Sequence, residues 1–569
     1  MNSFITFLKK HSYTSAFVIS VGLSFLLYGN TLKGEFVYDD AFFESRQEIR
    51  DIGYLPKLWI ESFIPDNPKA SLFRPLVTST FLLNFFVTGE STFGFHLVNI
   101  LFNAIACFLL YVLVLKLFNN QLLAILTALI WAFFPIHTES VAYIKSRDEI
   151  LSTVFLLLGW IAFIKATKSQ KVNIKYAALS SIFYIFAVFS KEFAFFGIFL
   201  YLATYYLQKK TAIINTIRLG FFYVPPFLVY LLLRIKALEQ YAFNPRPVIY
   251  ANNPLVGENI FVRILTSFKI VYIYLQRTFL PFKLSASYYF REVEPVKNIF
   301  TSWEALFGIL FIIFLLILII RKRTRKNPLG IGAIMFLVSY YPLSQIPPLG
   351  GKADIVAERW MYFPTVGLAI ILGYILTKLV EKRRSAGLIF FGSLLILYGA
   401  RTITRNRVWL SERTLYESII KDAPRSTQGY YLTAQLEIRE GNLEKAKELL
   451  QTANGIYDSH PNVVRSLGYV SYLEGDYDSA EQYIKKSISL NRDYEGNLLY
   501  AMTLAKQGRC GLMIQGGAKM LENYPESSEL KELMAVCFYK LGLTEESIKF
   551  FDWVPGETHE DKVYFIDSF

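Results

Sequence analysis

Cysteine and histidine are scarce in this chain: its 569 residues include three cysteines and five histidines. None of them stands at the spacing of a zinc or redox motif, so the sequence indicates neither kind of centre. Cys510 and Cys537 would pair in an oxidising compartment, although two separate buried helix cysteines fit the sequence better. No ligand spacing demands a metal ion. No cofactor is therefore firmly implied, and a divalent cation stays an open option.

Apolar residues, in contrast, are abundant and come in blocks. They make up 53% of the chain, and the blocks are about 17–25 residues long, the length that spans a bilayer. The basic excess lies in the first 400 residues, because residues 401–569 carry 20 Lys and Arg against 25 Asp and Glu while the whole chain has a net charge of +13. That excess sits in loops between apolar blocks, so it indicates membrane topology and not nucleic-acid binding.

The blocks predict an all-α polytopic membrane domain over residues 1–400, with about eleven spanning helices. We expect these helices at 13–32, 95–116, 121–137, 149–166, 176–190, 193–208, 214–233, 304–320, 329–346, 360–378 and 386–400. Lys- and Arg-rich loops all fall on the side of the N-terminus: Lys9, Lys10, Lys116, 165–175, Lys209, Lys210, Arg218, 321–326 and 378–384. Basic loops face the cytoplasm, so an odd number of spans puts the C-terminal part outside. Two further apolar segments, 71–89 and 264–281, are expected on the outer surface.

The segment 401–569 repeats with a period close to 34 residues. A glycine that would break a helix recurs at Gly441, Gly475, Gly508 and Gly542. After the first two, the small residues Ala446 and Ala480 allow a second helix to pack closely. This is the pattern of tetratricopeptide repeats (TPRs), whose helix pairs bury their apolar faces only by stacking on their neighbours. We expect a short soluble α-solenoid with one concave face for an extended polypeptide.

Two adjacent carboxylates, Asp39 and Asp40, open the first outer loop. An ionisable side chain at bilayer depth costs roughly 2.5–3.5 kcal/mol on insertion scales, so it is a functional hypothesis by default. Neighbouring side chains of an extended segment point in opposite directions, so one carboxylate can face a cleft while the other caps or bridges. The plainer alternative is a solvated loop, or a cap for a helix that starts at Ala41.

Three further charged clusters lie at outer helix ends. They are His137 and Glu139 with Arg147 and Asp148 after the third span, Lys191 and Glu192 between two spans, and Asp354, Glu358 and Arg359 before another span. Taken singly, each could be a set of helix caps, a charged turn or an interfacial anchor. Inner loops carry almost no Asp or Glu, however, so the four clusters together predict one polar cavity that opens outwards.

These segments, read in order, resemble a known family. YDD at 38–40, FRPL at 73–76, FGFHLVNILFNA at 93–104, FPIHTESVA at 134–142, SRDEIL at 146–151, SKE at 190–192 and VAERWMYFPTVG at 356–367 carry the likeness. They look like the transmembrane and TPR-containing O-mannosyltransferases and, more broadly, the GT-C superfamily of glycosyltransferases that use polyprenol-phosphate donors. The resemblance covers nearly the whole chain, and it implies a GT-C-like domain followed by the repeats.

The resemblance implies a catalytic acidic motif in the first outer loop, matched by Asp39 and Asp40. We expect Asp39 to act as the base that deprotonates the acceptor, with Asp40 and Glu139 orienting the substrates. Basic residues at outer helix ends are implied to face the donor phosphate: Arg147, Arg359 and Lys191. Residues expected to support the site are Arg74, His137, Asp148, Glu192 and Glu358. No metal ligand is assigned.

The predicted function is a membrane glycosyltransferase that moves a mannose-like hexose from a polyprenyl-phosphate donor to a protein hydroxyl, with inversion. One alternative is a ligase that transfers an oligosaccharide from a polyprenyl diphosphate. A non-enzymatic alternative is a membrane anchor that presents TPRs for assembly of an envelope complex. The expected partners are the lipid-linked donor, an extended acceptor polypeptide on the TPR face and the bilayer. A bacterial inner membrane with periplasmic TPRs is the expected location.

Overall fold

The computed structural model of this protein describes residues 12–551, apart from 66, 170, 210–212, 245–247, 249, 289–290 and 347–353. Lys9, Lys10 and Lys210 of the expected basic loops lie outside this part. The chain divides into two compact units, Met1–Ala423 and Pro424–Phe569. The division falls after Ala423, so α18 (Glu412–Asp422) lies in the first unit, and the expected domain boundary at residue 401 stays a prediction.

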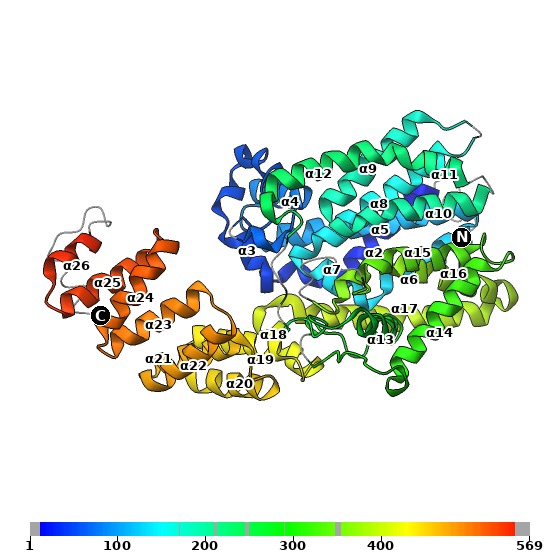
Figure 1. Ribbon diagram of the computed structural model, residues 1–569. Helices are drawn as coiled ribbons and strands as arrows, with labels where there is room; N and C mark the ends of the chain where they lie inside the picture. The colour runs from blue at the N-terminus through cyan, green and yellow to red at the C-terminus, as the bar shows by residue number, and fades with distance from the viewer. Residues whose placement is uncertain are drawn as a thin grey trace. The chain divides into compact units, whose positions relative to one another are not determined.

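Within the described residues of the first unit every regular element is helical, as expected. Its longer helices are α2 (Ser12–Tyr28), α4 (Pro75–Thr88), α5 (Thr92–Phe118), α6 (Gln121–Phe133), α8 (Arg147–Ala166), α9 (Ile174–Ser190), α10 (Gly197–Lys209), α11 (Ile213–Gly220), α12 (Val224–Leu238), α13 (Ile260–Phe279), α14 (Trp303–Ile320), α15 (Pro328–Tyr340), α16 (Thr365–Lys382) and α17 (Arg384–Asn406). Figure 1 shows α5, α8 and α9 running side by side. Apolar side chains of these helices form one continuous core.

Six helical segments of the described chain are long and apolar enough to cross a membrane: Tyr13–Lys33, Thr92–Phe118, Ile144–Ala166, Ile213–Tyr241, Trp303–Ile320 and Arg384–Leu410. A seventh is the pair Gln121–Phe133 and Pro135–Ala142, which is bent by 54°. The other expected spans are also helices, but they are shorter or more polar. The chain is therefore a polytopic helical membrane protein, and the expected count of eleven spans stays a prediction.

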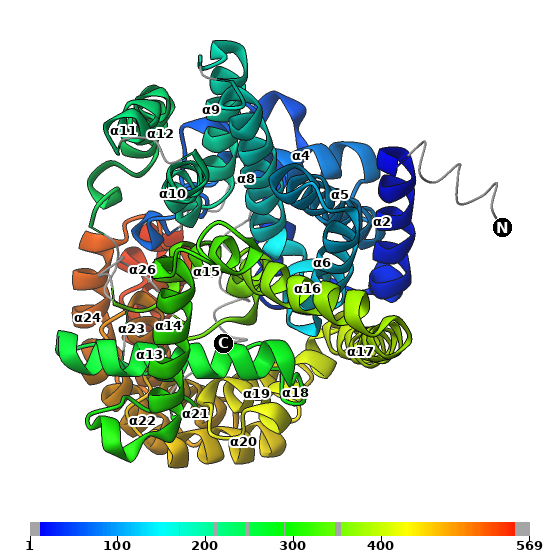
Figure 2. The ribbon, with the colours of Figure 1, turned by 90° about the vertical axis from the view of Figure 1, so that its right-hand side faces the viewer.

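The two apolar segments that were expected on the outer surface, 71–89 and 264–281, both contain helices. Residues 260–279 make α13, which runs across the direction of α5, α8 and α9 (Figures 1 and 2). One face of α13 is buried and the other carries Lys269 and Arg277, an arrangement suited to an interface. Residues 75–88 make α4, which is only 14 residues long. Neither segment satisfies the length and apolarity of a span.

The basic loops of the first unit gather at one end of the bundle. The Lys209 ammonium donates to the Lys168 carbonyl oxygen at 3.2 Å, and that of Lys326 donates to the Gln208 carbonyl oxygen at 3.2 Å. These contacts join three loops that are far apart in the sequence. They place the loops after α8, α10 and α14 on one common side.

The second unit is built of four helix pairs, as the repeat predicts. They are α19 (Thr427–Arg439) with α20 (Leu443–Ile456), α21 (Pro461–Leu473) with α22 (Tyr477–Leu490), α23 (Tyr494–Lys506) with α24 (Cys510–Asn523), and α25 (Ser528–Lys540) with α26 (Thr544–Phe551). The four turn glycines have φ between +74° and +81°, a conformation that favours glycine. Ala446 and Ala480 are fully buried between the paired helices.

A disulfide joins Cys510 of α24 to Cys537 of α25, with the two Cα atoms 5.0 Å apart. The expectation of two separate buried cysteines is therefore wrong. The sequence could not reveal the pairing, because a separation of 27 residues places the sulfurs together only once the third and fourth repeats are stacked. Cys107 stays free and buried in the first unit.

Candidate functional site

The first outer loop forms a short rigid turn, η2 (Tyr38–Asp40), after α2. Tyr38 has a φ of +58°, a left-handed conformation that costs a non-glycine residue roughly 1–3 kcal/mol. The Asp40 backbone N–H closes the turn on the Val37 carbonyl oxygen at 3.0 Å. The Asp39 backbone N–H donates to the Tyr143 hydroxyl at 3.1 Å, and the Tyr143 ring stacks on Trp409. The backbone of Asp39 is therefore held from two sides.

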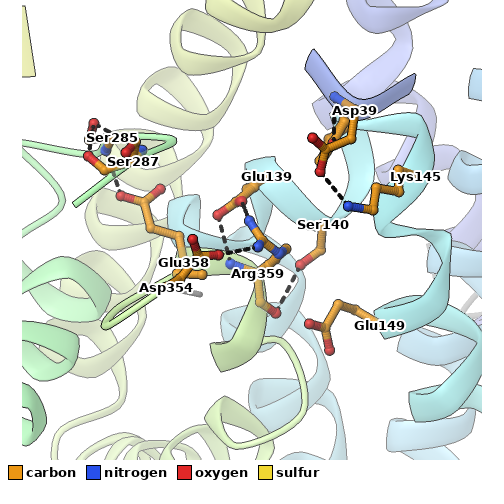
Figure 3. A network of polar contacts seen from close by, with 12 residues as sticks. Asp39, Glu139, Ser140, Lys145, Glu149, Ser285, Ser287, Asp354, Glu358 and Arg359 are labelled. Atoms are coloured by element: carbon orange, nitrogen blue, oxygen red, sulfur yellow. Dashed lines mark hydrogen bonds and ion pairs between the residues drawn. The ribbon is translucent and has the colours of Figure 1, made fainter. Parts of the chain in front are cut away.

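Asp39 is the exposed member of the acidic pair, with 49% of its side chain open to solvent. Its carboxylate forms an ion pair with the Lys145 ammonium (Figure 3). Partial burial would raise the pKa of Asp39, but the Lys145 ammonium outweighs that effect, helped by Arg359 and the Tyr143 hydroxyl, and the pKa lies below its ordinary value. Asp39 is therefore an ionised carboxylate at an accessible position.

Asp40, in contrast, is fully buried. One carboxylate oxygen accepts the backbone N–H of Val37 at 3.2 Å, and the other accepts that of Lys145 at 2.8 Å. Burial raises the pKa of Asp40 to about 8. In this structure the Asp40 side chain fastens the first loop to η8 (Ile144–Ser146), and its expected role in orienting substrate stays a prediction.

Glu139 and Arg359 meet at the centre of the site. Pro135 ends α6 and bends the chain, so α7 (Thr138–Ala142) presents a buried Glu139 towards η14 (Glu358–Met361). One Glu139 oxygen pairs with the Arg359 guanidinium, and the other accepts the Arg359 backbone N–H at 2.9 Å. A second guanidinium nitrogen lies 2.6 Å from the Asp354 carboxylate. Figure 3 shows these three side chains between Asp39 and Glu358.

Glu358 lies behind this group and is almost fully buried. Its carboxyl accepts the Ser285 backbone N–H at 2.7 Å and the Tyr288 hydroxyl. Burial raises the pKa of Glu358 to about 7, and the nearby Glu139 charge adds to the rise. Glu358 therefore ties the loop after α13 to η14 and does not face the open side of the site.

Lys191 and Glu192 follow α9. Their side chains point in different directions, because the backbone of Lys191 is extended. The Lys191 ammonium pairs with Glu149 and lies 3.5 Å from Asp148. Glu192 pairs with Arg74 at 3.0 Å, and Arg74 also reaches Asp148 at 2.5 Å. These five side chains form one charged network at the outer ends of α8 and α9.

A cavity of about 40 Å³ extends from this network into the bundle. Its polar end is formed by Glu149, Ser152, Thr153 and Lys191. Apolar side chains from α8, α10, α15 and the turn before α16 line the rest, among them Leu156, Leu200, Val338 and Phe363. The cavity therefore combines a charged part with an apolar part.

Arg147 does not belong to the open site. It is fully buried and donates to the Asn99 side-chain oxygen at 2.7 Å, the Phe95 carbonyl at 3.0 Å and the Thr80 carbonyl at 3.2 Å. Its guanidinium lies 4.4 Å from the Phe81 ring centroid. These contacts engage all three guanidinium nitrogens in the packed core, and the expected contact of Arg147 with a donor phosphate stays a prediction.

His137 is likewise a core residue. Its ring packs against Trp131 and Tyr362, and Nε2 lies 2.8 Å from the Thr365 hydroxyl. It supports the bend before α7 by packing. Among the described residues, no three His, Cys, Asp or Glu side chains are grouped so that they could hold a metal ion.

The remaining groups are connected through charge. Arg359 interacts electrostatically with Asp39 and Glu149, and Lys145 with Asp148. The structure thus brings together Asp39, Glu139, Arg359 and the network of Arg74 and Lys191. Sequence reasoning missed Lys145, although it stands between two recognised segments, FPIHTESVA and SRDEIL. The available signal was a lysine in the short stretch that joins these two segments.

Comparisons with known proteins agree with this arrangement. A model of the tetratricopeptide repeat matches residues 466–494. The chain is 26% identical over 430 residues to a protein O-mannosyl-transferase of Caenorhabditis elegans, covering 73% of this chain and 59% of that protein. It is 24% identical over 514 residues to protein O-mannosyl-transferase TMTC1 of Homo sapiens, covering 80% of this chain and 56% of the relative.

Solved structures add little. The TPR protein YrrB, described as having an unusual peptide-binding site, is 18% identical and covers 34% of this chain and 97% of its own, with a TM-score of 0.24. So low a score supports no argument about function.

The structure defines an all-helical membrane protein with a charged site at one end of its bundle and a separate TPR unit. The chain is a relative of the TPR-containing protein O-mannosyl-transferases, as the motifs of its outer loops predicted. It spans less than two thirds of the length of the relatives described above.

Proposed function

We propose that this chain is a glycosyltransferase that moves a mannose-like hexose from a polyprenyl-phosphate donor to a protein hydroxyl. The observation that carries the proposal is the half-exposed, ionised Asp39 beside Arg359, at the bundle end where the lipid-phosphate group of a donor would lie. Its kinship with protein O-mannosyl-transferases supports the same chemistry.

Asp39 takes the role of general base. Its carboxylate accepts the proton of a serine or threonine hydroxyl, and the hydroxyl oxygen then attacks the anomeric carbon as the bond to the phosphate oxygen breaks. The proton ends on Asp39 and passes to water after the product leaves. A single displacement inverts the anomeric configuration, because Asp39 is used as a base and not as a nucleophile.

Arg359 and Lys191 take the role of stabilising the departing phosphate. Arg359 has 18% of its side chain exposed, and its guanidinium fork matches phosphate oxygens. Both cations already pair with carboxylates, Arg359 with Glu139 and Asp354, and Lys191 with Glu149. These acids hold the cations in position, and a donor phosphate would bind by taking the place of one of the carboxylates now paired with each cation.

The cavity beside Lys191 marks where the first part of a polyprenyl chain would enter, although at about 40 Å³ its lining side chains must move apart to admit the chain. A lipid phosphate needs a charged group at bilayer depth and an apolar space directly behind it, and the Lys191 cavity offers both. The TPR unit would bind an extended acceptor polypeptide on its concave face, which is the usual use of such solenoids.

We also infer that the site faces the non-cytoplasmic side. The basic loops after α8, α10 and α14 lie together at one end, and loops of this kind face the cytoplasm. The three site residues lie at the other ends of the helices: Asp39 follows α2, Lys191 follows α9 and Arg359 precedes α16. The Cys510–Cys537 disulfide supports the same side for the TPR unit, because disulfides persist in oxidising compartments. A bacterial periplasm is the proposed location.

The central test is Asp39→Asn in membranes supplied with polyprenyl-phosphate mannose and an acceptor peptide. The rate of transfer should fall by about 10²–10⁴-fold, the usual contribution of a general base. Asp51→Asn is the matched control, because Asp51 is an exposed carboxylate of the same loop that accepts the Gly53 backbone N–H. Undiminished transfer by Asp39→Asn would overturn the base assignment, and activity with a diphosphate donor alone would indicate a ligase.

The sidedness has an independent test. In intact cells, a membrane-impermeant thiol reagent should label Cys510 and Cys537 only after an impermeant reductant has opened their disulfide. Cys107→Ser removes the third cysteine as background. Labelling of the pair without any reductant, or only after the membrane is permeabilised, would contradict the proposed side.

A further inference from the structure

Lys145 of η8 contacts both members of the acidic pair, Asp39 through its side chain and Asp40 through its backbone N–H. Its ammonium pairs with the Asp39 carboxylate, while its own backbone N–H donates to Asp40 at 2.8 Å. Its side chain is 19% exposed, compared with 49% for Asp39. The Lys145 ammonium points towards the Asp39 carboxylate (Figure 3), and about half of the Asp39 side chain remains exposed.

Such an arrangement holds the carboxylate in one orientation. The buried Asp40 anchors the backbone of Lys145 to the η2 turn, and the Tyr143 hydroxyl accepts the Asp39 backbone N–H at 3.1 Å. The ammonium thus approaches Asp39 from a fixed point. A base that is fixed relative to its acceptor reacts faster than one that must first be ordered, because orientation removes an entropic part of the barrier.

We propose that Lys145 is a positioning residue of the transferase: it keeps the Asp39 carboxylate ionised and aimed at the acceptor while it does not itself contact the sugar donor. This inference rests on the proposed function, since it assigns a role relative to Asp39 as the base.

The charged groups that face Asp39 decide whether its pKa rises or falls when Lys145 is replaced. They are Lys145 from η8, Arg359 from η14, the neighbouring Asp40 and the hydroxyl of Tyr143. Arg359 stays in place when Lys145 is replaced, but its fork remains bound to two other carboxylates. Loss of the ammonium therefore removes the strongest stabilisation of the ionised form, and the pKa of Asp39 rises.

The test is the pH dependence of kcat/KM for Lys145→Met, Lys145→Arg and the wild type in the full-length protein. In Lys145→Met the acidic limb should move upwards by about one pH unit, the lower end of the usual effect of an adjacent cation on a carboxylate. kcat should fall more than the KM for the donor rises, because the base and not the donor site is disturbed. Lys145→Arg should restore the wild-type limb.

A purely structural lysine would give a different result. Lys145→Met would then lower the amount of folded protein without moving the acidic limb, and that outcome overturns the proposal. If Lys145→Met does not fold, Lys145→Arg decides: an acidic limb above that of the wild type overturns the proposal, and a limb at or below it supports the proposal. Lys168→Met, an exposed lysine of the basic loops, is the control. Loss of transfer in Asp39→Asn with an unmoved limb in Lys145→Met would refute the inference alone, whereas an active Asp39→Asn would refute the proposed function.

Discussion

Glu139 binds Arg359 through both of its carboxylate oxygens, one on the guanidinium and one on the backbone N–H at 2.9 Å, although 220 residues separate them. This double contact fixes the position and the direction of the guanidinium at once. A lysine in place of Arg359 could match neither the fork nor the second contact with Asp354. The pair therefore depends on the identity of both side chains.

Arg359→Lys should lower kcat/KM by about 10²-fold, the usual effect of losing one donor aimed at developing charge. Glu139→Gln should have a similar effect, because its amide nitrogen would face one of the two donors that now bind an oxygen. The measurement is the steady-state rate with the polyprenyl-phosphate donor. Glu44→Gln in the exposed part of the first loop is the control. Activity near that of the control in both variants would exclude Arg359 from the site.

Replacing Arg147 should lower the stability of the protein and leave donor binding unchanged. Its three nitrogens each donate to a buried oxygen, so Arg147→Lys should lower thermal stability, by roughly 3–5 kcal/mol if the buried charge loses its partners. The protein that still folds should bind the donor with an unchanged KM. Thermal unfolding in detergent and donor titration of the folded fraction provide the two readings. A raised KM at unchanged stability would return Arg147 to the phosphate site.

The fold was largely accessible from sequence, because its signals are local. Apolar block length predicts the bundle, and Gly441 and Gly475 mark turns whose positive φ the structure confirms. The disulfide was not accessible, since the stacking of two repeats decides whether Cys510 and Cys537 meet.

The charged residues of the site could be predicted from the sequence, but the contacts that each of them makes could not. Asp39 and Asp40 were expected to diverge, yet only the fold shows that Asp40 is the buried member. Arg147 and Arg359 both stand beside acidic residues in sequence. They differ because α4 and α5 enclose Arg147 with carbonyl oxygens, whereas η14 exposes Arg359 to the site. Burial of this kind depends on which helices pack together, which no single motif encodes.

Ser152→Leu should distinguish long lipid donors from short ones. Ser152 lines the polar end of the cavity beside Lys191, and a leucine there would fill space of about 40 Å³. We expect the KM for a full-length polyprenyl-phosphate sugar to rise by about tenfold, which corresponds to roughly 1.4 kcal/mol of lost binding. A water-soluble short-chain donor serves as the matched control and should be affected less. Equal changes for both donors would mean that the lipid follows another path.

Glu358 predicts a pH dependence of stability. Burial raises its pKa from 4.5 to about 7, so the folded protein binds a proton that the unfolded chain has released between these values. The stability contributed by the neutral carboxyl is therefore fully present below pH 4.5 and is lost as the pH rises through 7.

Glu358→Gln stays neutral, and its side-chain oxygen can still accept the Ser285 backbone N–H and the Tyr288 hydroxyl. Its unfolding temperature relative to the wild type should thus increase from pH 5 to pH 8.5. Thermal unfolding followed by intrinsic fluorescence in detergent measures this difference, with Glu448→Gln at an exposed site of the TPR unit as control. A difference between variant and wild type that is constant over this range would contradict the raised pKa, because the Glu358 carboxyl would then not titrate between pH 5 and pH 8.5 in the folded protein.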